Sequence, residues 1–187
     1  MNRPPVEKHL TDSEVRALLS VIETIEDKAL TIFGLTSGCR VSEVVHLRVQ
    51  DIDYDRQVCS VWDEKKDLTR TIILPKDALQ IIRMALNARS KVGEYVFPFS
   101  YKTANRRFKA LCRKAGISPA KAHWHCLRHT FVVRARLAGW DTKAIQQQTG
   151  DSELTILRVY STLTPEERVQ IAESKPILPA EGGHDDH

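Results

Sequence analysis

Apolar residues recur at intervals of three and four along most of the chain, which is the spacing of an amphipathic helix. Thr11 and Glu14 have the spacing of a capping box, and Val15, Leu18 and Ile22 follow at helical intervals, so a helix is predicted from about residue 12 to 24. The same criteria predict further helices that end near glycine or begin near capping residues, at about residues 29–37, from 42, at 76–89, 103–115, 125–138, 141–148, 151–160 and 165–174.

Two short segments have the pattern of β-strands instead. Val58, Ser60 and Trp62 alternate with Cys59 and Val61, and a second apolar run covers residues 71–74. The polar residues 63–70 between them predict a hairpin or short meander with two lysines at its tip, and residues 51–55 have the composition of a turn. The pattern as a whole predicts a mainly helical α+β domain with a small antiparallel sheet on one side.

The length of 187 residues is enough for one domain with a sizeable core. Residues 1–9 are expected to be the remnant of a linker, residues 10–174 the domain, and residues 175–187 a disordered tail, because the tail has nothing to bury. No run approaches the eighteen or so apolar residues of a membrane span, and no signal peptide opens the chain. The four cysteines lack the close pairs of zinc or redox sites. These features predict a cytoplasmic protein.

Positive charge is concentrated in one part of the sequence. Residues 99–136 hold ten of the 28 Lys and Arg residues and three histidines but no Asp or Glu, whereas the remaining residues carry eighteen bases and 24 acids. The net charge of +4 therefore conceals a strongly basic third, whose expected partner is a polyanion. The alternative is a solvated helix face, but such faces normally mix both signs.

Three short motifs, in chain order, resemble the motif boxes of tyrosine recombinases, the phage integrase and Xer-type family. They are TSGCRVSE at residues 36–43, HCLRHT at residues 125–130, and the segment from Gly150 to Tyr160. In that family an Arg follows a Thr-Gly turn, a His-x-Leu-Arg-His-Thr helix supplies a second Arg, and a Tyr stands ten residues after a Gly. The resemblance covers the chain from Leu10 to Ile171 and implies the tyrosine recombinase catalytic-domain fold.

The resemblance implies that Arg40 and Arg128 clamp a DNA phosphate and that Tyr160 is the nucleophile. Permanently charged, bidentate guanidinium groups suit the charge that builds up on a pentavalent phosphorus. A phenolic oxygen that attacks in line forms a covalent 3′-phosphotyrosine, so rejoining needs neither ATP nor metal.

Further roles follow from the same resemblance. His125 serves as an acid or base near the phosphate, and Glu43 and His129 orient the clamp. A lysine of the hairpin protonates the departing 5′-oxygen. Counting back from Arg70 gives Lys65 for this role, with Lys66 as a near rival.

Each of these residues has an ordinary explanation when it is taken alone. A single Arg at a helix start is more often a surface charge, and a single Tyr after apolar residues is more often a packed aromatic. The joint spacing of the three motifs favours the catalytic reading. Two histidines four residues apart share a helix face and could suggest a metal, but no Glu stands between them as in metalloproteases, so no metal site and no cofactor is expected.

The predicted partner is double-stranded DNA, and no membrane is involved. The DNA-binding residues are expected to be Lys66, Arg106, Arg107 and Lys109. The family implies a homo-oligomer on DNA, with a synapsed tetramer as the working form and a monomer in isolation. Two rival functions are a type IB topoisomerase, which shares this catalytic set, and a DNA-binding module that has lost catalysis.

Two departures from the family pattern affect these expectations. Asp151 stands where the family has a His after its Gly, and an ionised carboxylate about 5 Å from a phosphate would cost on the order of 3 kcal/mol at an effective dielectric near 20. We therefore expect Asp151 to be protonated or to point away, with a helix cap favoured over a catalytic role. The family's N-terminal DNA-clamping domain is also missing, as in an excised domain or a natural short form.

Overall fold

A computed structural model describes residues 8–160 and 163–174 of the chain, without the side chains of Tyr160, Ala172 and Ser174. In chain order its elements are α1 (Asp12–Ser20), α2 (Ile25–Ser37), α3 (Val41–Val45), the 3₁₀ turn η1 (Val49–Asp51), β1 (Ile52–Asp53), β2 (Val58–Asp63), β3 (Leu68–Ile73), α4 (Lys76–Asn87), α5 (Tyr101–Lys114), α6 (Trp124–Leu137), α7 (Thr142–Thr149), α8 (Glu153–Tyr160) and α9 (Pro165–Ser174). The predicted mainly helical α+β fold is confirmed.

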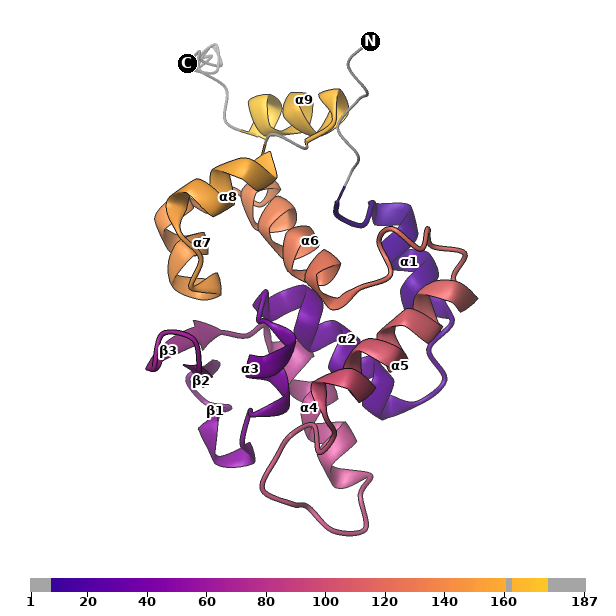
Figure 1. Ribbon diagram of the computed structural model, residues 1–187. Helices are drawn as coiled ribbons and strands as arrows, with labels where there is room; N and C mark the ends of the chain where they lie inside the picture. The colour runs from indigo at the N-terminus through magenta and orange to yellow at the C-terminus, as the bar shows by residue number, and fades with distance from the viewer. Residues whose placement is uncertain (1–7, 161–162, 175–187) are drawn as a thin grey trace, which may run out of the picture.

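The helix α2 lies at the centre of the larger of two apolar clusters and contacts α4, α5 and α6 (Figure 1). Thr24 caps its start by accepting a hydrogen bond from the backbone N–H of Asp27 at 3.1 Å. Leu30 and Phe33 are each 1% exposed, and each contributes about 1.5–3 kcal/mol by burial. The helix ends at Gly38, whose φ of 64° turns the chain sharply toward the residues of the site.

The second apolar cluster joins the C-terminal half of α6 to α7, α8 and the segment before α9 (Figure 1). Phe131 and Val132 of α6 pack there with Ile145 of α7 and Ile156 of α8, all of them buried. Since the N-terminal half of α6 belongs to the larger cluster, α6 connects the two. The fold thereby fixes the start of α8 relative to the end of α2.

The sheet has the strand order β1-β2-β3 and is antiparallel throughout, with Val61 of β2 opposite Arg70 of β3. Successive residues of a strand point to opposite faces. Cys59, Val61 and Asp63 of β2 therefore share the buried face, and Trp62 lies on the exposed face. The predicted hairpin is confirmed, with its turn at residues 64–67. The strand β1 was not predicted because its two residues have the composition of a turn.

Three element ends differ from the prediction by three residues or more. The helix α2 starts at Ile25 rather than near residue 29. The first helix stops at Ser20 rather than near residue 24, because Thr24 already caps α2. The strand β3 starts at Leu68, three residues earlier than expected. Residues 1–7 of the predicted linker and the predicted tail lie outside the described residues. In the described part, no helix is long and apolar enough to cross a membrane.

Candidate active site

Arg128 lies in the interior between two helix ends. Its side chain is 1% exposed, and its guanidinium donates to the carbonyl oxygens of Gly38 at 2.6 Å and Thr149 at 2.7 Å. These residues stand at the C-terminal ends of α2 and α7, where carbonyl groups have no partner within the helix. The buried cation is thus held by the negative ends of two helices.

Arg40 is the N-cap residue of α3 and follows the turn at Gly38 by two residues. Its side chain is 29% exposed, and Nη1 contacts Glu43 at 3.0 Å and Asp63 at 2.9 Å. Glu43 also accepts a hydrogen bond from the backbone N–H of Arg40 at 2.8 Å. The two carboxylates therefore fix the orientation of the Arg40 guanidinium from one side. The predicted orienting role of Glu43 agrees with these contacts and stays a prediction.

Two residues of this cluster were not predicted as site residues, Arg70 and Asp63. Arg70 binds Glu43 through both terminal nitrogens at 2.9 and 2.8 Å, and its Nε donates to the carbonyl of Gln148 at 3.1 Å. Asp63 is 2% exposed. The strand pattern carried a signal for both, because Asp63 follows Val61 by two residues and Arg70 precedes Ile72 by two. Each polar side chain thus falls on the inward face of its strand.

Asp151 joins the two arginines. Its Oδ1 lies 3.0 Å from Nη2 of Arg40 and 2.6 Å from Nη2 of Arg128, and its Oδ2 accepts from Nε of Arg128 at 2.9 Å. Burial alone would raise the pKa of Asp151, but the hydrogen bond and charge of Arg128, with the charge of Arg40, outweigh burial and lower this pKa. The carboxylate is therefore ionised and points into the site.

This geometry corrects the expectation for Asp151. The helix-cap prediction is wrong, because the hydroxyl of Ser152 caps α8 by accepting from the backbone N–H of Thr155 at 3.3 Å. The expectation that the carboxylate points away is also wrong, because it faces both arginines. Gly150, with a φ of 73°, ends α7 and turns the next residue back toward the arginines. A catalytic role for Asp151 remains untested.

His125 and His129 lie one turn apart on α6, with ring centroids separated by 4.6 Å and ring planes at 83°. Loss of hydration lowers the pKa of His125, and the charge of Arg128 lowers it further. Burial, together with His125, lowers the pKa of His129 to about 4. Both imidazoles are neutral at pH 7 as a result. No cluster of three potential metal ligands occurs among residues 8–160 and 163–174.

The two hairpin lysines differ in their contacts. The ammonium group of Lys66 donates to the carbonyl of Gly150 at 2.5 Å, next to Asp151. The side chain of Lys65 is exposed, and its backbone N–H donates to Asp63 at 3.1 Å. The structure thus brings the nitrogen of Lys66 to the edge of the site. The assignment of the acid to Lys65 is not tested by these contacts.

Tyr160 is the last residue of α8, directly after the buried Val159. Its side chain lies outside the described part of the structure. The helix that leads to it begins two residues after Asp151, so the backbone of the predicted nucleophile is connected to the clamp by a single short helix. Its role as nucleophile stays a prediction.

The basic third is partly neutralised by acids from the first two helices and the loop between them. Arg107 contacts Asp27 at 2.6 Å and Glu26 at 3.5 Å, and its guanidinium lies over the ring of Phe99. Further pairs of the same kind join Lys114 to Glu23 and Lys121 to Glu14. The absence of acids within residues 99–136 did not reveal these partners, because they are distant in sequence. The charge of Arg107 is therefore paired within the chain, and its predicted contact with DNA stays a prediction.

Arg106 and Lys109 are different from Arg107. Both are exposed on α5, and in the described part of the chain neither makes an ion pair. Together with Arg113 they line a groove of about 410 Å³ between α5 and the loop that leads to α6. Among the described residues of the basic third, these three and the exposed Lys102 make no ion pair and stay available to an external anion.

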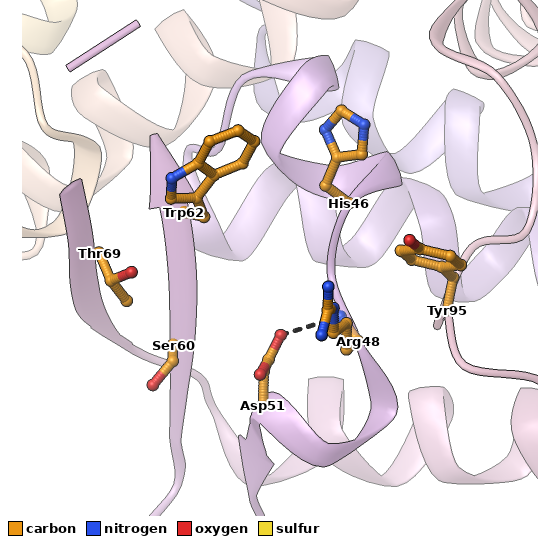
Figure 2. A pocket seen from close by; sticks show the side chains of 7 residues that line it. All are labelled: His46, Arg48, Asp51, Ser60, Trp62, Thr69 and Tyr95. Atoms are coloured by element: carbon orange, nitrogen blue, oxygen red, sulfur yellow. Dashed lines mark hydrogen bonds between the residues drawn. The ribbon is translucent and has the colours of Figure 1, made fainter. Parts of the chain in front are cut away.

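A separate cavity of about 360 Å³ lies between the end of α3 and the exposed face of the sheet (Figure 2). His46 and Trp62 are neighbours there, with ring centroids 6.1 Å apart, and Tyr95 lies on the side of His46 away from Trp62. Arg48 in this cavity contacts Glu94 at 3.3 Å. Since Trp62 and Asp63 point to opposite faces of β2, this cavity is distinct from the clamp.

Comparison with known proteins identifies related chains. The tyrosine recombinase XerA of Pyrococcus furiosus is 31% identical over 182 residues, which cover 91% of this chain and 63% of XerA. XerA of Thermococcus onnurineus is 32% identical over 192 residues, covering 94% and 67%. The chain thus spans about two thirds of the length of these relatives, and slightly less for the first.

Solved structures show the same fold. A crystal structure of XerA recombinase matches with a TM-score of 0.78 at 24% identity, covering 92% of this chain and 65% of that one. The Tn1549 transposon integrase in complex with transposon right end DNA matches with a TM-score of 0.74 at 19% identity, covering 93% and 68%. The model of the phage integrase family matches residues 8–167, and the chain therefore belongs to the phage integrase family.

Proposed function

We propose that this chain is the strand-cleaving domain of a site-specific tyrosine recombinase, which breaks and rejoins double-stranded DNA through a covalent 3′-phosphotyrosine. The observation that supports this most directly is the convergence of two guanidinium groups on one small anion. Arg40 and Arg128 both contact the carboxylate of Asp151 within 3.0 Å. A non-bridging phosphate oxygen has the charge and size to take the same position.

In the proposed reaction, the hydroxyl oxygen of Tyr160 attacks phosphorus in line and loses its proton. The bond from phosphorus to the 5′-oxygen breaks, and this oxygen leaves with the electron pair and takes up a proton. The guanidinium groups of Arg40 and Arg128 balance the charge that grows on the non-bridging oxygens. His125 is neutral at pH 7 because its pKa is lowered, so it is able to accept a proton. Attack by a 5′-hydroxyl on the phosphotyrosine reverses the step and needs no ATP.

We infer that Lys65 donates the proton to the 5′-oxygen, with Lys66 as the rival. Substitution of each lysine by Ala, tested on DNA that carries a bridging 5′-sulfur, separates the two. A thiolate leaves without protonation, so the variant that lacks the general acid is rescued by sulfur and the other variant is not. Rescue of Lys66→Ala alone would transfer the role to Lys66.

We infer that the DNA duplex lies across the clamp and the free part of the basic third, with Lys66, Arg106 and Lys109 on its phosphates. Two structural neighbours support a DNA partner, the XerH recombinase bound to difH substrate and the Tn1549 integrase bound to transposon DNA. The proposed working form is a homo-oligomer on DNA, a synapsed tetramer, in the cytoplasm.

Incubation with nicked suicide duplexes, followed by denaturing electrophoresis, tests the proposed function. We expect a covalent adduct with the wild-type chain and none with Tyr160→Phe, while the DNA affinity of the variant stays within about twofold because only a hydroxyl is removed. Tyr101→Phe is the matched control, since Tyr101 is an exposed tyrosine at the start of α5. An adduct that persists in Tyr160→Phe would refute the assignment.

One observation favours a second function, a DNA-binding module with weakened catalysis. The carboxylate of Asp151 occupies the clamp and supplies negative charge where the proposed reaction needs positive charge. On this alternative, the wild-type chain binds DNA but forms no adduct, and Asp151→His restores the adduct.

A further inference from the structure

Three guanidinium groups and three carboxylates form one connected cluster. Arg40, Arg70 and Arg128 supply the positive charges, and Glu43, Asp63 and Asp151 supply the negative ones, linked by contacts of 2.6 to 3.0 Å. The most exposed of these side chains is Arg40, at 29%. The formal charges of the cluster cancel, so the clamp has no excess positive charge for an external anion while all six groups are ionised.

The three carboxylates do not occupy equivalent positions. Glu43 and Asp63 bind Nη1 of Arg40, and Glu43 also binds Arg70, so both lie behind the clamp. Asp151 instead binds Nη2 of Arg40 together with Nε and Nη2 of Arg128. Nη1 of Arg128 is already used by the carbonyl of Gly38. The edges of the two guanidinium groups that could receive a phosphate are therefore those that Asp151 holds.

We propose that Asp151 is an internal competitor for the scissile phosphate, so that a phosphodiester enters the clamp only when this carboxylate leaves it. Two anions cannot share the same donors without strong repulsion. Asp151 is able to leave, because it belongs to neither helix and stands between Gly150, which ends α7, and Ser152, which caps α8. The identity of the entering anion as a DNA phosphate rests on the proposed function, whereas the competition itself is a property of the clamp.

Calorimetric titration of the full chain with sulfate at pH 7 tests the competition without any DNA chemistry. Asp151→Asn keeps the size of the side chain and removes its charge, and we expect sulfate to bind it at least tenfold more tightly than the wild type. Glu153→Gln is the matched control, because it removes one negative charge at an exposed position two residues away. If Asp151→Asn gains no more affinity than Glu153→Gln, the competition does not exist.

A second measurement needs no variant and keeps the test valid if Asp151→Asn folds poorly. In the wild type, the Nε–H of Arg128 donates to Asp151, so its NMR resonance reports the presence of the carboxylate. We expect this resonance to shift in step with sulfate binding. Sulfate binding that leaves it unchanged would overturn the proposal. If both sulfate results hold and suicide duplexes still give no adduct, the proposed function fails and the competition stands.

Discussion

Replacement of Arg70 by Met is expected to destabilise the chain by about 3 kcal/mol, near the lower end of the range for breaking a buried ion pair. The side chain of Arg70 is 9% exposed, and that of Glu43 is 1% exposed. The substitution removes both hydrogen bonds from Arg70 to Glu43 and leaves a buried carboxylate without its main partner. The cost stays near the lower limit because Glu43 keeps the guanidinium and the backbone N–H of Arg40.

Urea unfolding followed by circular dichroism measures this change as a difference in the free energy of unfolding. The control is Arg56→Met, which removes an 84% exposed guanidinium paired with Asp53 at 3.8 Å and should cost less than about 0.5 kcal/mol. In the double variant with Glu43→Gln, we expect a loss smaller than the sum of the single losses by about 1–3 kcal/mol. The reasoning is refuted if Arg70→Met costs no more than Arg56→Met.

Three further outcomes follow from the structure. Arg40→Ala should slow cleavage of suicide duplexes by about a hundredfold or more, because the charge of Arg40 is proposed to act on the transition state. An unchanged rate of adduct formation on denaturing gels would contradict this prediction. Arg106→Ala should weaken DNA binding and reduce the dependence of the binding constant on salt by about one unit of slope. Arg107→Ala should instead lower the stability of the fold and leave this slope unchanged. Equal slopes for the two variants would contradict this distinction. The stability of the wild type should fall as the pH drops from about 6.5 to about 4, because the unfolded chain binds a proton at His129 in this range and the folded chain does not. Urea unfolding at several pH values measures this change. The same fall in His129→Gln would exclude His129 as its cause.

Most of the fold could be predicted because its elements are specified by local pattern. The capping box at Thr11, the left-handed turn at Gly38 and the Pro at the start of α9 act within a few residues, and the structure has helix ends at all three. The strand β1 was missed because its pairing with β2 is a tertiary contact, as in the pair of Ile52 and Cys59. Two residues offer too little periodicity for a pattern to be recognised.

The candidate site was predicted in its composition but not in its electrostatics. Spacing identified Arg40 and Arg128, yet it could not show that Asp151 lies between them, because this contact joins residues 111 positions apart in sequence. The ion pair of Arg107 was missed for the same reason, because its partner Asp27 is 80 positions away in the sequence. Charge counts along a sequence reveal only local partners, and they overestimated the free positive charge of this chain.

Arg128 connects the chemistry of the site to the stability of the fold. Its guanidinium satisfies carbonyl groups at the ends of α2 and α7 and lies at the negative ends of both helix dipoles, which lowers the cost of burying its charge. Because folding fixes this orientation, the proposed binding of a phosphate would need little rearrangement of the cation, which is the condition for strong transition-state stabilisation. The same contacts mean that loss of Arg128 would disturb two helix ends as well as the clamp. Activity lost in an Arg128 variant can therefore be assigned to chemistry only after folding has been measured, whereas the more exposed Arg40 permits a direct test.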